Sequence, residues 1–235
     1  MKIQILMSFV MAAVPSLLLT VYFYRQDKRS PEPKRLILKI FLLGVIFTFP
    51  VYILETIISR TNIYFSISPF LFYFFEAFVV AGLCEEYIKL GIVKRYVYHD
   101  RHFNEVMDGI VYAVVASLGF ACMENILYVL NGTWRTALAR AFTAVPMHAV
   151  CSGMMGYYVG LAKFATTKKR EEFLISRGFW QAVLIHGTYN LLLFVSPMPG
   201  LIYSLCVVMY LFCTFLKLKD RMRRAQKYYT KIKSV

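Results

Sequence analysis

The sequence of 235 residues is 59% hydrophobic and only 17% charged, and it carries a formal net charge of +14. A soluble domain typically has about 25% charged residues and about half apolar ones. A chain of this size cannot bury so much apolar surface in a core of its own. The composition therefore excludes a soluble globular enzyme, a disordered chain and a disulfide-stapled secreted domain, and it indicates a surface covered by lipid.

Apolar segments long enough to cross a bilayer, about 20 residues each, recur along the whole chain. We therefore predict an all-α fold, a polytopic membrane helix bundle of about seven transmembrane helices that forms a single domain over residues 1–235. The first span is expected to be an uncleaved anchor, because its apolar stretch is too long for a signal peptide. In chain order, the predicted spans are residues 3–24, 37–58, 70–93, 106–129, 139–162, 179–196 and 201–217.

The basic residues separate onto alternate sides of these spans. Of the 27 Lys and Arg residues, 22 lie in the loops after spans one, three and five, in the tail after span seven, or at the span ends that adjoin them. Because cytoplasmic loops carry an excess of Lys and Arg, this pattern predicts an outside N-terminus and a basic cytosolic tail over residues 217–235. Anionic lipid is the expected partner of the tail, and no nucleic acid is expected. The basic residues assigned to the outer side are Lys2, Arg60, Arg135 and Arg140.

The third span contains Glu76, Glu85, Glu86 and Lys89. A charge at the centre of a bilayer costs about 2.5–3.5 kcal/mol, so such residues are functional candidates. Glu85 and Lys89 are four residues apart and share a helix face, whereas Glu86 is rotated by about 100°. One glutamate can thus face a water-filled cavity while the other braces against Lys89 or a neighbouring helix. An ion-pair staple between helices is the structural alternative, and Glu76 is expected to be a packing or gate residue.

The next three spans each add an ionisable residue. Span four has Phe120 and Glu124 on one face, span five has His148, and span six has His186 and Asn190 on one face. Glu124 suits a proton carrier, a metal ligand or a hydrogen bond between helices. At 1.5 Å per residue, the expected depths of the glutamates and histidines spread over about 15 Å. That spread permits a single site without requiring one.

Spans four and five also contain residues with an expected structural role. Pro146 is predicted to bend span five, because it cannot donate a backbone hydrogen bond. Ser152, Gly156 and Gly160 follow at four-residue spacing and predict a stripe that another helix approaches closely. Asp108, at the start of span four, is predicted to cap its helix.

Four short motifs occur in order on four successive spans: EEYIK at 85–89, FACME at 120–124, VPMHA around His148, and HGTYN at 186–190. In this order they resemble the PrsW family of intramembrane proteases, within the CAAX-protease and bacteriocin-processing superfamily. The resemblance covers roughly residues 70–195, which it marks as the catalytic core. It implies that the catalytic residues are Glu85, Glu86, Glu124, His148, His186 and Asn190, with Lys89 and Phe120 in supporting positions.

Peptide hydrolysis in a membrane needs water, a base and donors for the tetrahedral oxyanion. We expect Glu85 to be the leading base, kept ionised by Lys89, with Glu86 as its partner or proton shuttle. His186 and Asn190 would polarise the carbonyl. Asn190 stands where PrsW sequences often have Asp, and this departure toward the CAAX-protease form favours an amide donor.

A metal centre is the alternative mechanism. His148, His186 and Glu124 would then hold Zn²⁺, whose bound water becomes the nucleophile. The HExxH motif of many zinc peptidases is absent, so the sequence leaves the metal and metal-free mechanisms open.

The resemblance also implies the substrate and the location. The substrate would be a single-span membrane protein, an anti-sigma factor, cut near the outer surface as the first (site-1) step of a stress-response proteolytic relay. The enzyme would be a multi-pass protein of the bacterial cell membrane. The main alternative from another class is a proton-coupled transporter or channel that uses the same glutamates as a relay.

Overall fold

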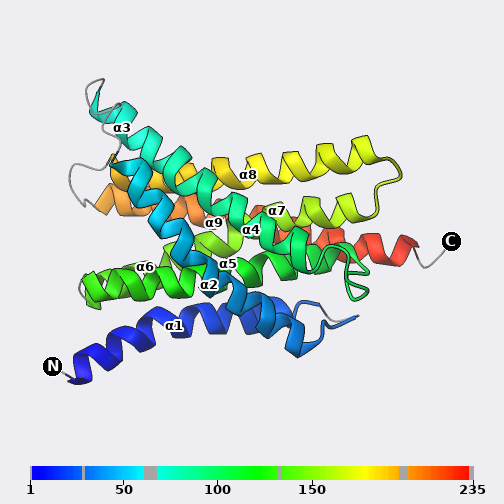
Figure 1. The fold of residues 1–235 in the computed structure, drawn as a ribbon, viewed down its shortest axis with the longest axis horizontal. Coiled ribbons are helices and arrows are strands. Elements are labelled where there is room, and N and C mark those ends of the chain that lie inside the picture. Colours follow the sequence, from blue (N-terminus) through cyan, green and yellow to red (C-terminus); the bar gives the residue numbers. More distant parts are fainter. Residues whose placement is uncertain (1, 28–29, 61–67, 132–133, 196–200, 233–235) are drawn as a thin grey trace.

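The computed structural model describes residues 2–27, 30–60, 68–131, 134–195 and 201–232, and every regular element within these ranges is a helix. Most of the helices run lengthwise beside one another (Figure 1). This arrangement confirms the all-α prediction. The helices are α1 (Lys2–Tyr24), α2 (Lys34–Ser59), α3 (Pro69–Phe75), the π-helix η2 (Glu76–Leu83), α4 (Cys84–Tyr96), α5 (Val106–Asn131), α6 (Trp134–Phe142), α7 (Ala144–Lys163), α8 (Lys168–Phe194) and α9 (Leu201–Ile232).

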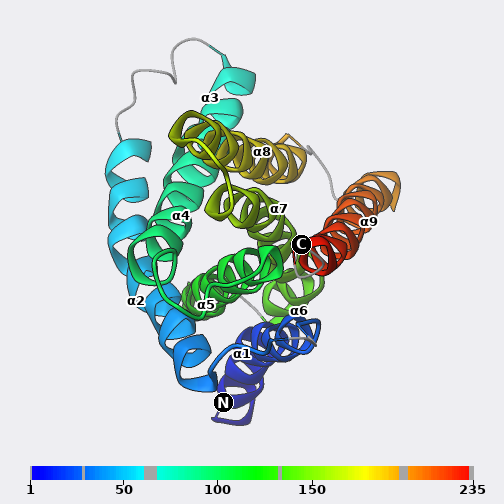
Figure 2. The same ribbon diagram turned by 90° about the vertical axis from the view of Figure 1, so that its right-hand side faces the viewer.

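Helices α5 and α7 lie at the centre of the bundle, and the other long helices surround them (Figure 2). Their backbones approach closely where glycines face each other. A Cβ atom on Gly156 would collide with the carbonyl oxygen of Gly109, and one on Gly160 would collide with the backbone of Val106. The predicted stripe of small residues is therefore confirmed as the contact between these two central helices.

The outer helices present large apolar side chains to their surroundings. On α2, Leu38, Ile46, Ile53 and Ile57 are each more than half exposed. Within the described ranges, α2 and residues 106–130 of α5 are long and apolar enough to cross a membrane by length and composition, but only α2 faces outward, because α5 is buried inside the bundle. An apolar surface of this kind is typical of a helix that contacts lipid.

The helix boundaries differ from the predicted spans in three places. Predicted span 139–162 is broken at Thr143 into α6 and α7, and Pro146 lies in the first turn of α7, where a missing backbone donor is tolerated. Helix α8 begins well before predicted span 179–196, directly after Thr167, whose side chain accepts a capping hydrogen bond from the backbone N–H of Arg170. Apolar length marks the lipid-facing part of a helix, whereas caps mark its ends.

The third difference is in the predicted tail. Helix α9 continues beyond the predicted span 201–217 as far as Ile232. Leu218, Met222 and Ala225 recur at helical spacing and are buried, and the guanidinium of Arg221 lies 5.2 Å from the centroid of the Tyr157 ring. The first part of the basic tail is therefore packed against the bundle.

The helical segment that carries Glu85 and Glu86, residues 69–96, is not a regular α-helix throughout. Residues Pro69–Phe75, the π-helical turns Glu76–Leu83 and α4 follow one another without a break, and the hydroxyl of Ser68 caps the start by accepting from the N–H of Leu71. A π-helical turn adds a residue per turn and rotates everything that follows. Here it comes directly before Glu85 and Glu86 and thus sets the direction in which both side chains point.

Candidate active site

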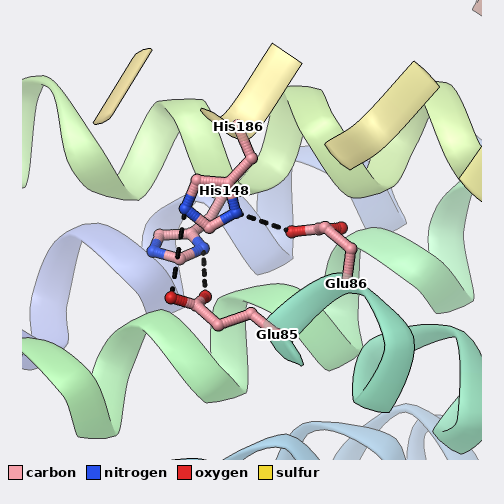
Figure 3. Close-up of side chains that lie close together, drawn as sticks. All are labelled: Glu85, Glu86, His148 and His186. Atoms are coloured by element: carbon pink, nitrogen blue, oxygen red, sulfur yellow. Dashed lines mark hydrogen bonds and ion pairs between the residues drawn. The ribbon is translucent and has the colours of Figure 1, made fainter. Parts of the chain in front are cut away.

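Helices α4, α7 and α8 bring four ionisable side chains into one buried cluster (Figure 3). Each of Glu85, Glu86, His148 and His186 places one donor atom within 4.8 Å of a donor atom of the others. None of the four residues is more than 4% exposed. Glu124 of α5 joins the cluster through His148, at 2.8 Å. The sequence allowed these side chains to differ in depth by about 15 Å, and the packing of the helices brings them together at one site.

The ammonium group of Lys89 lies in the middle of this cluster. Its Nζ atom is 2.8 Å from Oε2 of Glu85, 2.9 Å from Oε1 of Glu86 and 3.0 Å from Nδ1 of His148. The ring of Phe120 covers the same ammonium, with its centroid 4.7 Å away. The predicted pairing of Glu85 with Lys89 is confirmed, and one buried cation also pairs with the neighbouring glutamate.

The two adjacent glutamates differ in how fully their oxygens are engaged. Glu86 is completely buried, and it accepts hydrogen bonds from His186 Nδ1 and from Ser152 Oγ, both at 3.0 Å. Among the described residues, Oε1 of Glu85 has no hydrogen-bond partner and lies 4.0 Å from Nε2 of His186. Glu86 therefore holds its neighbours in place, whereas Glu85 keeps one oxygen available.

Hydrogen-bond partners determine where the protons of both imidazoles lie. An ammonium can only donate, so Nδ1 of His148 accepts from Lys89, and its Nε2 carries the proton that is donated to Glu124. Nδ1 of His186 donates to Glu86, which leaves the lone pair of the neutral ring on Nε2. Each ring thus turns one lone pair toward the cluster and is oriented by a carboxylate on its far side.

A second cation reaches the cluster from the short helix α6. Arg140 places a guanidinium nitrogen 2.8 Å from Oε1 of Glu124, and its Nε donates to Oδ1 of Asn125 at 2.7 Å. The ring of Tyr128 lies 3.8 Å from the guanidinium carbon, in cation–π contact. Arg140 thereby neutralises Glu124 and ties α6 to α5.

A cavity of about 400 Å³ lies beside the cluster between α2, η2, α5 and α8. Its polar lining includes Glu55, Glu85, Glu124 and Asn190. Glu86 does not line this cavity. A polar cavity of this size has room for several water molecules. Water can therefore reach Glu85 while Glu86 stays behind it.

Glu76 lies on the wall of the same cavity. Its Oε2 accepts a hydrogen bond of 3.0 Å from Ser59 Oγ, which joins η2 to the end of α2. This contact agrees with the packing or gate role expected for Glu76.

Three further residues of the site, Glu55, Arg140 and Ser152, are not part of the four sequence motifs and were not predicted to belong to it. Glu55 and Arg140 lie within the predicted spans 37–58 and 139–162, so the cost of a charge in lipid already pointed to both. The charge count instead assigned Arg140 to the outer side, whereas the structure turns it inward to Glu124. Ser152, which donates to Glu86, belongs to the small-residue stripe and carries no distinguishing sequence signal.

The cluster fits a divalent transition-metal ion in its donor types. Nδ1 of His148, Nε2 of His186 and the carboxylate of Glu85 converge, and imidazole with carboxylate is a common ligand set of catalytic zinc. Glu124, expected as the third ligand, contacts His148 through the nitrogen on the far side. The ammonium of Lys89 lies among the same donors, so a metal ion would compete with it for Glu85 and His148.

Comparison with known proteins agrees with this arrangement. Residues 32–216 match the sequence profile of the PrsW family, described as intramembrane metalloproteases. Protease PrsW of Geobacillus kaustophilus (strain HTA426) is 36% identical over 214 residues, which cover 91% of this chain and 92% of the relative. Protease PrsW of Clostridioides difficile (strain 630) is 29% identical over 232 residues, 97% and 93% of the two chains.

A further relative, Protease PrsW of Bacillus subtilis (strain 168), is 36% identical over 179 residues, 76% of this chain and 79% of the relative. No solved structure matches the chain significantly. The matched range 32–216 contains the whole buried cluster and the cavity beside it. The chain therefore belongs to the PrsW family of intramembrane metalloproteases.

Proposed function

We propose that this protein hydrolyses a peptide bond of a single-span membrane protein, close to the extracytoplasmic surface. The observation that carries the proposal is the position of Glu85. Its carboxylate borders a polar cavity, accepts a hydrogen bond from Lys89, and lies within 4.0 Å of a nitrogen of each of the two histidines. A base beside water in an otherwise apolar bundle is what peptide hydrolysis within a membrane requires. The matched family is a protease family, and each of the named relatives is a protease. No observation favours the transporter alternative.

In this proposal, each of these residues has one step in the reaction. Oε1 of Glu85 takes a proton from water as the water oxygen attacks the carbonyl carbon of the substrate. The amide of Asn190, on the wall of the same cavity, donates to the carbonyl oxygen while negative charge develops there. Glu85 then passes the proton to the leaving nitrogen as the C–N bond breaks. Lys89 holds the base in position through its hydrogen bond to Oε2 of Glu85, and Glu86 accepts from the same ammonium.

The histidines would serve the same reaction with a bound metal. A divalent ion such as Zn²⁺, held by His148, His186 and Glu85, would supply Lewis-acid chemistry to the water and the carbonyl. Chelation tests this role. If the metal is required, activity falls when the purified protein is treated with a chelator and returns with added Zn²⁺. Unchanged activity in metal-depleted protein would assign the chemistry to Glu85 and Lys89 alone.

We further propose a multi-pass location in a bacterial cell membrane, with the N-terminus outside and the C-terminus in the cytosol. The separation of basic residues supports this orientation, as does the position of the start of α1 and the end of α9 at opposite ends of the bundle (Figure 1). In this orientation the cavity, lined by the last turns of α2 and α8, opens in the outer half. The resemblance to PrsW proteases favours an anti-sigma factor as the substrate.

Cleavage by purified protein tests the proposal. Full-length protein is reconstituted in liposomes with a tagged single-span substrate, and the fragments are separated by electrophoresis. Glu85→Gln and His186→Ala should each abolish cleavage with the protein still folded, whereas Glu172→Gln, an exposed carboxylate on α8, should cleave normally. Cleavage by a variant that lacks both Glu85 and His186 side chains would refute the assignment.

A further inference from the structure

A second cluster of carboxylates lies far from the active site. Asp27, in the loop after α1, Glu32, in the loop before α2, and Asp108, in the first turn of α5, each place an oxygen within 4.8 Å of the others. They are 3%, 2% and 0% exposed. Asp108 and Glu124 are sixteen residues apart on α5, about 24 Å at 1.5 Å per residue, so this cluster is distinct from the active site.

The hydrogen bonds around these carboxylates leave two buried oxygens without a partner. Oδ2 of Asp108 accepts from the N–H groups of Asn104 and Glu105, both at 2.7 Å, and Oε2 of Glu32 accepts from the Tyr112 hydroxyl. The remaining oxygens, Oδ1 of Asp108 and Oε1 of Glu32, are inaccessible and have no hydrogen-bond partner. A buried acceptor without a partner costs about 1–3 kcal/mol, and more when it is charged.

Charge pairing around Glu32 and Asp108 is also unusual within the described ranges. Among the described residues neither carboxylate forms an ion pair with Lys, Arg or His, although the chain has an excess of basic residues. Burial, and after it the charge of Asp27, raises the pKa of Glu32 to about 7, against the lowering effects of the Tyr112 hydroxyl and of the neighbouring Asp108 carboxyl. Two buried carboxylates with unfilled oxygens need either protons or a cation.

We propose that Asp27, Glu32 and Asp108 form a binding site for a hard divalent cation of the Mg²⁺ or Ca²⁺ class. Carboxylate oxygens are the ligands that these ions prefer, and the set contains no sulfur or imidazole that would favour zinc. A bound ion would fill both orphan oxygens and offset the buried negative charge. It would also fasten the loop between α1 and α2 to the start of α5, the central helix that carries Glu124 at its other end.

Terbium luminescence tests the site directly, because Tb³⁺ binds oxygen ligands of the same kind and is sensitised by a nearby tyrosine. Tyr112, hydrogen-bonded to Glu32, is such a ring. Titration of the full-length, metal-depleted protein in detergent should give a saturable signal that Ca²⁺ displaces. Asp108→Asn, which keeps an oxygen for the two backbone N–H groups, should raise the half-saturating Tb³⁺ concentration about tenfold or more.

Two matched controls separate this site from others. Asp100→Asn changes a carboxylate of the neighbouring loop that is 32% exposed and outside the cluster, and Glu85→Gln changes the active site, so both should keep the Tb³⁺ signal of the proposed site. As a second measurement, Ca²⁺ or Mg²⁺ should raise the unfolding temperature of the unchanged protein and of both controls, but not that of Glu32→Gln.

Two results would overturn the proposal. One is a Tb³⁺ titration of Asp108→Asn and Glu32→Gln that is identical to that of the unchanged protein. The other is an unchanged protein whose stability is independent of Ca²⁺ and Mg²⁺ and equal to that of Glu32→Gln, which would mean that the carboxyl groups share a proton instead.

Discussion

Replacing Lys89 by Met removes the ammonium that two buried carboxylates share. Nζ lies 2.8 Å from Glu85 and 2.9 Å from Glu86, with side-chain exposures of 0% for Lys89 and at most 5% for the glutamates. With an effective dielectric constant of about 20, each contact corresponds to an attraction of about 6 kcal/mol. Burying the ammonium offsets much of this attraction. Removing one partner of a buried ion pair costs about 3–5 kcal/mol, and we expect the free energy of unfolding to fall by about that amount.

The measurement is unfolding in mixed micelles with increasing amounts of a denaturing detergent, followed by helical circular dichroism. Lys94→Met, on the exposed face of the same helix, is the control and should leave stability unchanged. Combining Lys89→Met with Glu85→Gln and Glu86→Gln removes the uncompensated charges and should restore most of the stability. A loss below about 1 kcal/mol for Lys89→Met, the size expected for an exposed pair, would refute this account of Lys89.

Three further variants test the packing and the site. Gly156→Ala should lower the free energy of unfolding by about 1–3 kcal/mol, because the added methyl collides with the backbone of α5. Gly91→Ala, whose methyl meets nothing within 4 Å, should be neutral or stabilising by up to about 1 kcal/mol in the same assay, and equal losses would contradict the close approach. Ser152→Ala should cost about 1–3 kcal/mol by leaving a buried oxygen of Glu86 unpaired, whereas the exposed Ser176→Ala should cost nothing measurable. Glu124→Gln, which still accepts from the histidine but loses its charge, should lower kcat/KM for peptide cleavage about 10- to 100-fold, and unchanged kinetics would show that orienting this ring is unimportant.

The positions of the two long apolar helices α2 and α5 were predictable because of a strong physical constraint. Backbone groups in lipid must find their hydrogen bonds within the same segment, so a long apolar run becomes a helix. The predicted spans 37–58 and 106–129 accordingly agree with Lys34–Ser59 and Val106–Asn131 to within a few residues. The start of α8 and the length of α9 were not predictable from hydropathy, because polar turns continue a helix outside its apolar part until a cap ends it.

The members of the buried cluster were also largely predictable. Glu85, Glu86, Lys89, Glu124 and both histidines are expensive in lipid, and the structure brings them together. Their catalytic roles stay predictions that the proposed variants test. The same cost rule, applied to every span, would also have identified Glu55 and Arg140 as residues of the site.

By itself, the sequence determined the all-α class, the positions of the long apolar helices α2 and α5 and the set of side chains that are costly in lipid, because these depend on composition and local spacing. Only the tertiary structure decided which atoms meet. It showed that Lys89 lies between both glutamates and a histidine, and that Glu85 alone of the adjacent pair borders the cavity. It also joined Asp27 and Glu32 to Asp108, which the sequence had indicated only as a helix cap. These contacts join residues of different helices, and their geometry depends on how the helices rotate and approach, which no local pattern specifies.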